Sequence, residues 1–488
     1  MALALVAWGA WLRWPHLDGG LWLDEFGTLW AARGEDDGET IRRVYAVHGQ
    51  SPAYYLLVRW TVGLVGERAW SLRLPSFVVG CALPLLGAWA LWPQGRRRAG
   101  AALLLLVVQP ALLFHSEQAR PYAVGAGLAL LSVCGLYRAL DRGRGSARLV
   151  AWGAWVAATY VHPVFGPAGA GLLLGVCATP APRRYPIKTA LVDAALATLT
   201  LLPVIAHSGG LFGRRAELDW IRSFDPYTLQ ILAPGALPLL LLAGGYAVYR
   251  ARVGGPAPRR AAFARGALAC ELGLTLVPLL AVLAVWGISG VSLLTSRYLL
   301  LSGLGVVLLS ARLIGGLPWP LAGLALACVV LSPGARAARG PRAEPQWRAA
   351  LAAVDALALA DDAPVLVAPG FAEVDRMAYP PFALPPQREA FLAAPVTQRP
   401  GRPPDHRPVG LLPGAWGQSP HQLEYLERRV VPLLRSAPRF AVIAPPGIEA
   451  DLGDWLAWRF PGRFRRVARS GELLSVGVVS GWEVRRGR

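Results

Sequence analysis

The sequence predicts an α-helical polytopic membrane protein with roughly eleven transmembrane helices, followed by a small extracytoplasmic α/β domain. Of its 488 residues, 54% are hydrophobic and only 16% are charged. The mean hydropathy is +0.41, which is far from that of a soluble domain. The apolar residues gather in runs near the ~20 residues that a helix needs to cross a bilayer. These runs end near residue 335, and short β-like stretches follow.

Eleven apolar runs justify the predicted spans. They lie at about 1–16, 70–91, 99–115, 121–140, 148–163, 164–180, 188–206, 229–250, 265–290, 297–314 and 317–333. A further run, 52–66, is about fifteen residues long and carries Arg59, so it predicts an interfacial or re-entrant helix instead of a span. The first run has no basic segment before it and no small-residue cleavage site, so we expect a retained span.

The arginines orient these spans. The formal net charge is +19, and Lys188 is the single lysine. With 52–66 left out of the count, the basic loops fall on one side of the membrane, as the positive-inside rule expects. These loops are 96–98, 142–148, 183–188 and 250–265. The opposite, outer side then receives the loops 16–69, 115–121, 207–228 and 290–297 and all residues after 334. The pattern predicts contact with membrane lipids and no binding of nucleic acid.

The change in composition near residue 335 predicts two domains, a membrane domain at 1–334 and a separate soluble α/β domain at 335–488. Its β-like stretches are 364–368, 439–444 and 473–479, and 421–434 has helical spacing of apolar residues. The Pro- and Arg-rich stretch 379–420 predicts a long loop. The five cysteines of the chain all lie in the preceding hydrophobic runs, so they predict neither a disulfide framework nor a metal site.

Two adjacent carboxylates, Asp24 and Glu25, lie in the apolar, tryptophan-rich stretch LWLDEFGTLW. A carboxylate at a membrane edge is costly, about 2.5–3.5 kcal/mol if moved to the centre of a spanning helix, so it marks a functional site. Outside the membrane it can take the proton from a hydroxyl that attacks a sugar. The alternative is that Asp24 only caps a short helix. Arg120 and Arg297, also on the outer side, can stabilise the phosphate of a departing lipid.

A series of motifs adds a family resemblance. In order they are LDE at 23–25, HGQSPAYYLL at 48–57, ERAWSLRLPS at 67–76, HSEQARPYA at 115–123 and SRYLL at 296–300. This ordered series, which covers about residues 1–330, resembles the GT-C fold membrane glycosyltransferases. More narrowly, it is similar to the family 39-like group of protein mannosyltransferases and lipid A aminoarabinose transferases.

The resemblance implies transfer of a sugar from a polyprenyl-phosphate donor to a glycan, lipid or protein acceptor at the outer face of the inner (plasma) membrane. Asp24 matches the essential first-loop carboxylate and Glu25 its neighbour, and these are the predicted catalytic residues. The positions predicted to bind substrate are His48, Tyr54, Glu117, Arg120, Tyr122, His162, Arg297 and Tyr298. His48 stands in a spacing one residue longer than the usual form, and Arg73 matches a packing position.

Several alternatives remain open at this level. Glu117 and Arg120 are three apart and suit an ion pair, His115 and His162 suit histidines at the membrane edge, and Tyr54 suits an aromatic belt. Asp24 with Glu117 can hold a divalent ion, but the resemblance implies activity without one, so we predict no metal and no cofactor. The competing functions are a transporter or flippase for a lipid-linked sugar, and an inactive assembly factor of envelope glycan synthesis.

Overall fold

The computed structural model describes residues 2–47, 51–181, 184–213, 258–289, 293–332, 346–370, 386–414, 416, 420–473 and 476–485. Contacts between residues divide the chain into two compact units, each made of segments that are distant in the sequence. The first unit consists of Met1–Leu17, Gly49–Leu57 and Arg73–Pro341. The second consists of Asp18–His48, Val58–Leu72 and Arg342–Arg488. The division at 334/335 that composition predicts stays a prediction.

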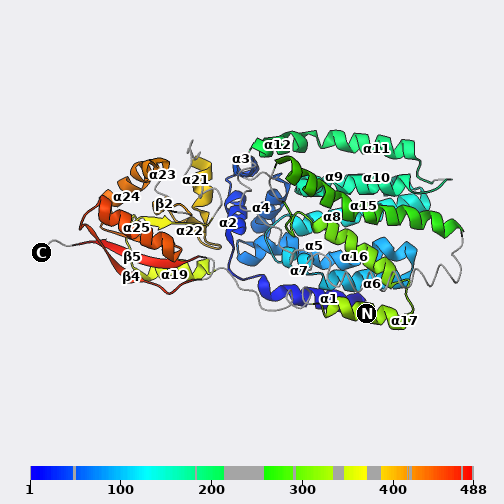
Figure 1. The fold of residues 1–488 in the computed structure, drawn as a ribbon, viewed down its shortest axis with the longest axis horizontal. Helices are drawn as coiled ribbons and strands as arrows, with labels where there is room; N and C mark the ends of the chain where they lie inside the picture. Colours follow the sequence, from blue (N-terminus) through cyan, green and yellow to red (C-terminus); the bar gives the residue numbers. More distant parts are fainter. Residues whose placement is uncertain are drawn as a thin grey trace. The chain divides into compact units, whose positions relative to one another are not determined.

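The first unit is a bundle of helices that run side by side (Figure 1). Its helices are α1 (Ala2–Arg13), α6 (Arg96–Val108), α7 (Pro110–Ser116), α8 (Tyr122–Arg142), α9 (Gly145–Val161), α10 (Ala168–Cys177), α11 (Ile187–Thr200), α12 (Leu202–Gly213), α15 (Pro258–Ser289), α16 (Leu300–Ile314) and α17 (Trp319–Val330), with the 3-10 turns η1 (Trp14–His16), η2 (Trp92–Gln94) and η3 (Pro163–Phe165). Helices α4 (Ala53–Val65) and α5 (Ala69–Leu91) each contribute residues to both units. Each apolar run predicted as a span contains at least one helix in its described part, and the run at about 229–250 lies outside the described residues.

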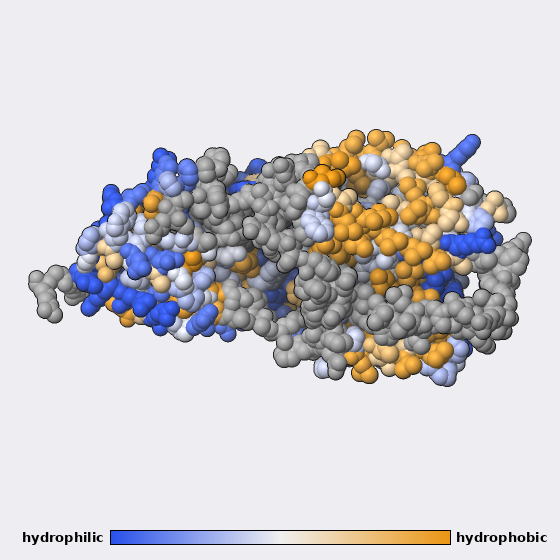
Figure 2. Space-filling model, in the orientation of Figure 1, coloured by the Kyte–Doolittle hydropathy of each residue, from blue (hydrophilic) through white to orange (hydrophobic). Residues whose placement is uncertain are grey.

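Apolar side chains remain exposed on the surface of this bundle. On α15, leucines at positions 268, 272, 276 and 280 recur every four residues and are 39–60% exposed. Figure 2 shows apolar residues spread over the face of the bundle that it presents. A soluble protein would cover such a stripe, whereas a bilayer solvates it.

Among the described helices, three are long and apolar enough to cross a membrane. They are Ala69–Gln94, Tyr122–Arg142 and Phe263–Ile288, and the bent pair α6–α7 makes a fourth if it counts as one span. The structure is therefore mostly helical, with helices that can span a bilayer. The predicted number of roughly eleven spans and the side on which each loop lies stay predictions.

The predicted span at 99–115 is broken into α6 and α7, which meet at 57°. Pro110 has no N–H to donate to the preceding turn, and Gln109 adopts an extended backbone conformation. The Gln109 side chain restores a hydrogen bond by accepting from the Ala111 N–H at 2.8 Å. The bend directs α7 toward the loop at 117–121, which carries predicted site residues.

Glycines and one buried ion pair fix the packing of the long helices. A Cβ on Gly135 of α8 would lie 2.4 Å from the Ala151 nitrogen of α9, so only glycine permits this approach. Deeper in the bundle, Glu271 of α15 binds Arg312 of α16 through two hydrogen bonds of 2.5 and 2.7 Å. The Tyr137 hydroxyl of α8 donates to the same carboxylate at 2.7 Å. These contacts join α8, α15 and α16.

The second unit combines helices of the predicted first outer loop with an α/β layer. Its helices are α2 (Leu23–Ala32), α3 (Asp37–Val47), α19 (Trp347–Ala356), α21 (Pro386–Leu392), α22 (Ala394–Thr397), α23 (Pro420–Tyr425), the π-helix η6 (Leu426–Val430), α24 (Val431–Ser436) and α25 (Pro446–Arg459). Its strands are β1 (Val365–Val367), β2 (Val409–Leu411), β3 (Arg439–Ala444), β4 (Phe464–Arg469) and β5 (Val478–Val484). They form one sheet in the order β2-β1-β3-β5-β4. Strand β1 is parallel to β2 and β3, and β5 is antiparallel to β3 and β4.

Helices cover both faces of this sheet. Gly481 of β5 approaches Leu357, next to α19, whereas the neighbouring Trp482 approaches Gly453 of α25. Successive residues of a strand point to opposite faces, so α19 and α25 lie on opposite sides. The predicted strands at 364–368 and 439–444 are confirmed as β1 and β3, and 421–434 is helical.

Two expectations for this unit are wrong in detail. The stretch 379–420, expected to be a long loop, contains α21, α22 and strand β2 in its described part. The short strand β2 is flanked by prolines, which concealed it in the composition, and the parallel pairing with β1 holds it in place. The third strand begins later than predicted, at Val478, because Leu473 and Gly477 pair with each other in an isolated bridge.

Candidate active site

The two adjacent carboxylates occupy the first turn of α2 and have different surroundings. The Glu25 side chain is fully buried, and its Oε2 accepts a hydrogen bond from the Trp22 backbone N–H at 3.2 Å. Glu25 therefore caps the helix, which the helix dipole also favours. Asp24 is half-buried instead of enclosed. The capping role that the sequence left open for Asp24 is thus performed by its neighbour.

Contacts within the second unit hold α2 at both ends. Near its start, the Phe26 ring packs edge-on against Trp347, with ring centroids 6.2 Å apart. At its end, Arg33 binds Glu67 through two hydrogen bonds of 2.5 and 2.8 Å. Arg33 also donates to the Gln398 side chain at 2.7 Å and to two backbone carbonyls of the same segment. Bidentate pairing of arginine with a carboxylate fixes orientation, so α2 has a defined position within this unit.

Tyr54 lies in the first unit and is buried. Its hydroxyl is 2.9 Å from the Ser76 Oγ, which in turn donates to the Arg120 backbone carbonyl at 2.9 Å. Both Tyr54 and Ser76 have no exposed surface. The chain of hydrogen bonds links α4, α5 and the loop at 117–121, so Tyr54 fixes the backbone from which the Arg120 side chain projects.

Aromatic rings form a continuous series beside that loop. The His115 ring lies 4.8 Å from the Tyr122 ring, and Tyr122 lies 5.1 Å from the His162 ring, measured between centroids. The Arg120 guanidinium carbon is 6.0 Å from the centroid of Tyr122. Glu117, the residue that follows α7, is almost fully buried. The loop at 117–121 thus places a carboxylate and a guanidinium beside a series of tilted aromatic rings.

His162 occupies the break between α9 and η3. Its Nδ1 accepts a hydrogen bond from the Val164 backbone N–H at 3.1 Å, so in the neutral ring the proton is on Nε2. The positive charges of Arg120 and Arg297 both act on this imidazole, which is nearly buried. The ring therefore presents an N–H donor in a region that already holds two guanidinium groups.

Arg297 and Tyr298 lie in the turn that leads into α16. Both side chains are half-buried, and the Arg297 guanidinium carbon is 5.2 Å from the Tyr298 ring centroid. A guanidinium over an aromatic face is held by cation–π attraction. The last motif of the sequence therefore supplies a second oriented arginine to the region of Arg120 and His162.

The structure thus groups the sequence-predicted residues in two sets. The first unit holds Tyr54, Glu117, Arg120, Tyr122, His162, Arg297 and Tyr298. Asp24 and Glu25 belong to the second unit, and His48 lies outside the described residues. Arg73 is buried and donates to the backbone carbonyls of His16 and Leu17, both at 2.9 Å, which fits a packing role.

Sequence reasoning did not identify Ser76 as part of this arrangement. Its hydroxyl connects two motifs, and the pattern Pro75-Ser76 in the third motif was a signal for it. His115 suits a histidine at the membrane edge in the sequence, but its ring packs between those of Phe114 and Tyr122, with centroids 5.2 and 4.8 Å away. In the described part of the chain, no three His, Cys, Asp or Glu side chains lie together as a metal site requires.

The chemistry available to the first set is anion binding. Two guanidinium groups and an imidazole N–H are donors for phosphate oxygens. The carboxylate of Asp24, on a helix of the other unit, is a group that can accept a proton.

Comparison with known proteins gives structural matches alone, because neither a protein family nor a curated protein matches the sequence. The ArnT structure from Cupriavidus metallidurans bound to undecaprenyl phosphate shares 15% identity and a TM-score of 0.46, over 98% of this chain and 97% of ArnT. Arabinosyltransferase EmbB from Mycobacterium smegmatis shares 18% identity and a TM-score of 0.42, over 64% of this chain and 30% of EmbB.

The Archaeoglobus fulgidus oligosaccharyltransferase, tethered with an acceptor peptide, shares 11% identity and a TM-score of 0.49, over 97% of this chain and 73% of that protein. The proteins matched are GT-C fold membrane glycosyltransferases, the class that the ordered motifs resemble. With identities of 11–18% and TM-scores below 0.5, these likenesses assign no role to any residue of this chain.

Proposed function

We propose that this protein is an integral membrane glycosyltransferase that moves a sugar from a polyprenyl-phosphate donor to an acceptor. The observation that carries the proposal is the convergence of Arg120, Arg297 and the His162 imidazole in a helical bundle with an exposed apolar surface. A lipid phosphate needs both properties, since its chain requires the bilayer and its head group requires cationic donors.

In the proposed reaction, an acceptor hydroxyl oxygen attacks the anomeric carbon of the donor sugar. The bond from this carbon to the phosphate oxygen breaks, and polyprenyl phosphate leaves with the electron pair. The hydroxyl proton passes to a carboxylate. Negative charge on the departing phosphate is stabilised by Arg120 and Arg297, and preorganised donors of this kind supply a large share of catalysis.

We assign the base to Asp24 and a supporting role to Glu25. The Glu25 carboxylate is buried and accepts the capping hydrogen bond of α2, whereas Asp24 is partly open on the same turn. A base must reach its proton within hydrogen-bond distance, which favours the more accessible group. Tyr54 acts through Ser76 on the Arg120 backbone, and Tyr298 orients Arg297.

The remaining assignments follow from the motif order. Glu117 and Tyr122 would contact the donor or the acceptor beside Arg120, and His48 would supply a further contact to the substrate. We place the reaction at the outer face of the inner (plasma) membrane, and the acceptor is a glycan, a lipid or a protein. The membrane domain 1–334 would bind the donor, with 335–488 outside the membrane.

The test is transfer of radiolabelled sugar in membranes from a panel of polyprenyl-phosphate sugars. Asp24→Asn is compared with the natural chain at matched expression, and Glu35→Gln, an exposed carboxylate of the same segment, is the matched control. Loss of a general base typically lowers the rate about 10²–10⁴-fold, so we expect transfer to vanish in Asp24→Asn alone. Equal transfer by Asp24→Asn and Glu35→Gln would refute the assignment of Asp24 as the base. Absence of transfer from every donor, in the natural chain as well, would favour a transporter or an assembly factor.

A further inference from the structure

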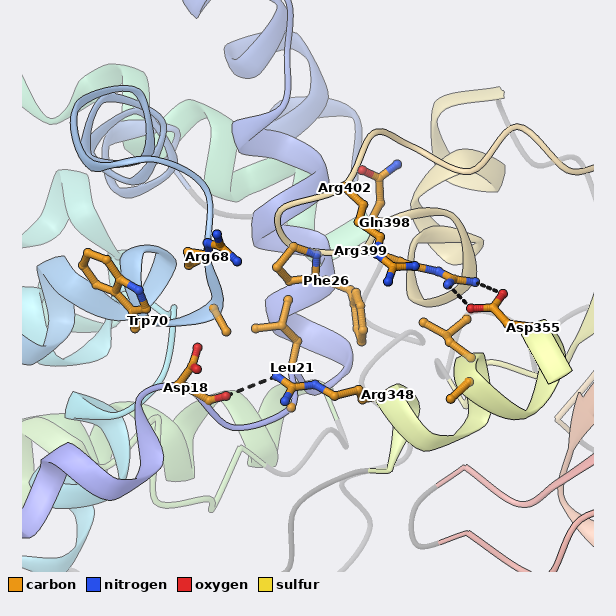
Figure 3. A pocket seen from close by; sticks show the side chains of 15 residues that line it. Asp18, Leu21, Phe26, Arg68, Trp70, Arg348, Asp355, Gln398, Arg399 and Arg402 are labelled. Atoms are coloured by element: carbon orange, nitrogen blue, oxygen red, sulfur yellow. Dashed lines mark hydrogen bonds and ion pairs between the residues drawn. The ribbon is translucent and has the colours of Figure 1, made fainter.

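The second unit contains a pocket of about 590 Å³ that the proposed reaction does not use. Its lining comes from the segments before and within α2, the start of α5, α19 and the residues after α22 (Figure 3). The volume falls in the range of small-ligand sites, about 300–1,000 Å³. Leu21 and Phe26 are part of the lining, and they flank the turn that carries Asp24. The pocket therefore adjoins the proposed base within one unit.

Cationic groups dominate the pocket. Its lining holds four arginines and two aspartates, so the arginines are in excess. One arginine, Arg399, is already neutralised by Asp355 through hydrogen bonds of 2.6 and 3.0 Å, on one side of the pocket in Figure 3. Arg348 donates to the backbone carbonyl of Asp18 at 3.2 Å, which neutralises no charge.

The other two arginines, Arg68 and Arg402, are exposed, and neither makes an ion pair with a described residue. Both also line an adjoining recess of about 630 Å³, so they lie where the two hollows meet. Three guanidinium groups thus face one remaining carboxylate, that of Asp18. An arginine fork matches the oxygens of a phosphate or a carboxylate, so the chemistry of this pocket suits an anion.

An aromatic wall restricts the class of anion. Trp70 lies on the same side of the pocket as Arg68, and 36% of its surface is exposed (Figure 3). An exposed indole beside a charged group offers an apolar face together with polar contacts, which suits the ring of a sugar. A free inorganic ion would gain nothing from Trp70 or from the apolar residues Leu21 and Phe26.

We propose that this pocket binds the acceptor and that the acceptor is an anionic sugar, with its phosphate or carboxylate on Arg68, Arg348 and Arg402 and its ring on Trp70. The proposal rests on the proposed function, because it makes the pocket the place from which a sugar hydroxyl reaches Asp24. The anionic sugar is the head group of a glycolipid or a free sugar phosphate.

The test is equilibrium binding to the full chain in nanodiscs, with labelled glucose 1-phosphate as the soluble probe and a phosphorylated glycolipid in the nanodisc as the second arm. Methyl glucoside and inorganic phosphate are the competitors. Loss of one charged hydrogen bond typically weakens binding about tenfold or more, so Arg68→Gln and Arg402→Gln should each do so. Asp355→Asn, which releases Arg399, should tighten binding, and added salt should weaken it.

Arg428→Gln is the matched control, because Arg428 is an exposed arginine of the same unit that pairs with Glu424 and lines neither hollow. Unchanged binding in the Arg68→Gln/Arg402→Gln variant would overturn the proposal. If methyl glucoside competes as well as unlabelled glucose 1-phosphate, the ligand need not be an anion. If inorganic phosphate competes as well as unlabelled glucose 1-phosphate, the ligand need not contain a sugar. Binding in both arms supports a shared site, whereas binding of the glycolipid alone assigns the source to the membrane.

The binding assay also separates this proposal from the proposed function. Asp24→Asn should abolish transfer and leave binding of the probe unchanged, because Asp24 does not line the pocket. If binding depends on Arg68 and Arg402 but transfer does not depend on Asp24, the pocket stands as an anionic-sugar site and the transferase assignment fails.

Discussion

Replacement of Glu271 by glutamine tests how the bundle holds its late motif. The natural carboxylate is fully buried and accepts two hydrogen bonds from Arg312 and one from Tyr137. Glu271→Gln keeps the shape but leaves the Arg312 guanidinium, whose side chain is only 10% exposed, without its counter-charge. Loss of one partner of a buried ion pair costs about 3–5 kcal/mol, because the other charge stays desolvated.

The effect should extend beyond stability, because α16 links this pair to the site. Arg312 lies near the end of α16, and the Arg297 turn leads into its start. The helix has 15 residues and is therefore about 22 Å long at 1.5 Å per residue. A loosened end of α16 should displace the turn and weaken donor binding in addition to lowering the free energy of unfolding.

Denaturant unfolding in detergent measures the stability change, and Glu424→Gln, which removes half of an exposed pair, is the control. Exposed helical pairs contribute only about 0.3–0.5 kcal/mol. The double variant Glu271→Leu/Arg312→Met removes both charges and should recover to within about 1 kcal/mol of the natural chain. Tyr137 keeps an acceptor in this variant, the Ala267 carbonyl at 3.2 Å. A double variant as unstable as Glu271→Gln would refute the account of an uncompensated charge.

Two further predictions concern charged groups of the sites. Arg297→Gln should raise the KM for the polyprenyl-phosphate donor about 10–150-fold, because a charged hydrogen bond is lost. Arg297→Lys keeps the positive charge, so its KM should lie between those of Arg297→Gln and the natural chain. Equal KM values in all three chains would contradict a phosphate contact. Hydrogen bonds from Arg399 hold the pKa of the Asp355 carboxyl below its usual value. The ionised carboxylate therefore stabilises the fold at neutral pH, and this stabilisation is lost as the pH falls through the lowered pKa. The destabilisation caused by Asp355→Asn should therefore be complete at neutral pH and fade below about pH 4 in unfolding experiments, and a difference independent of pH would contradict this sign.

Apolar periodicity and length predicted the helices of the first unit well, because each run must satisfy its own backbone hydrogen bonds whatever its neighbours are. The break in the predicted span at 99–115 was readable at Gln109-Pro110, where proline removes a donor. Strand β2 was not predicted. Its three residues form a strand because they pair with β1, and a local sequence pattern cannot indicate a pairing with a distant segment.

The candidate site was predictable as a set of residues and not as an arrangement. Motif order selected Arg120 and Arg297, and the end of a predicted span selected His162, but the packing of helices that brings the three together cannot be predicted from the sequence. The sequence matched Asp24 to the essential carboxylate and Glu25 to its neighbour, but it left the capping role open for Asp24, and the hydrogen bond from the Trp22 N–H gives that role to Glu25. Likewise Arg68 and Arg402 belong to segments distant in the chain, so no spacing rule could have paired them.

The second unit brings together segments that are distant in the chain. Helix α2, with Asp24, precedes two of its partners by several hundred residues: Phe26 packs on Trp347, and Arg33 binds Gln398, 365 positions further along the chain. Contacts between such distant segments form slowly, because a long loop must close before they are gained. The Arg33–Glu67 pair, whose residues are 34 positions apart, should therefore form before the contacts with Trp347 and Gln398, so the full anchoring of the helix that carries Asp24 is a late event in folding.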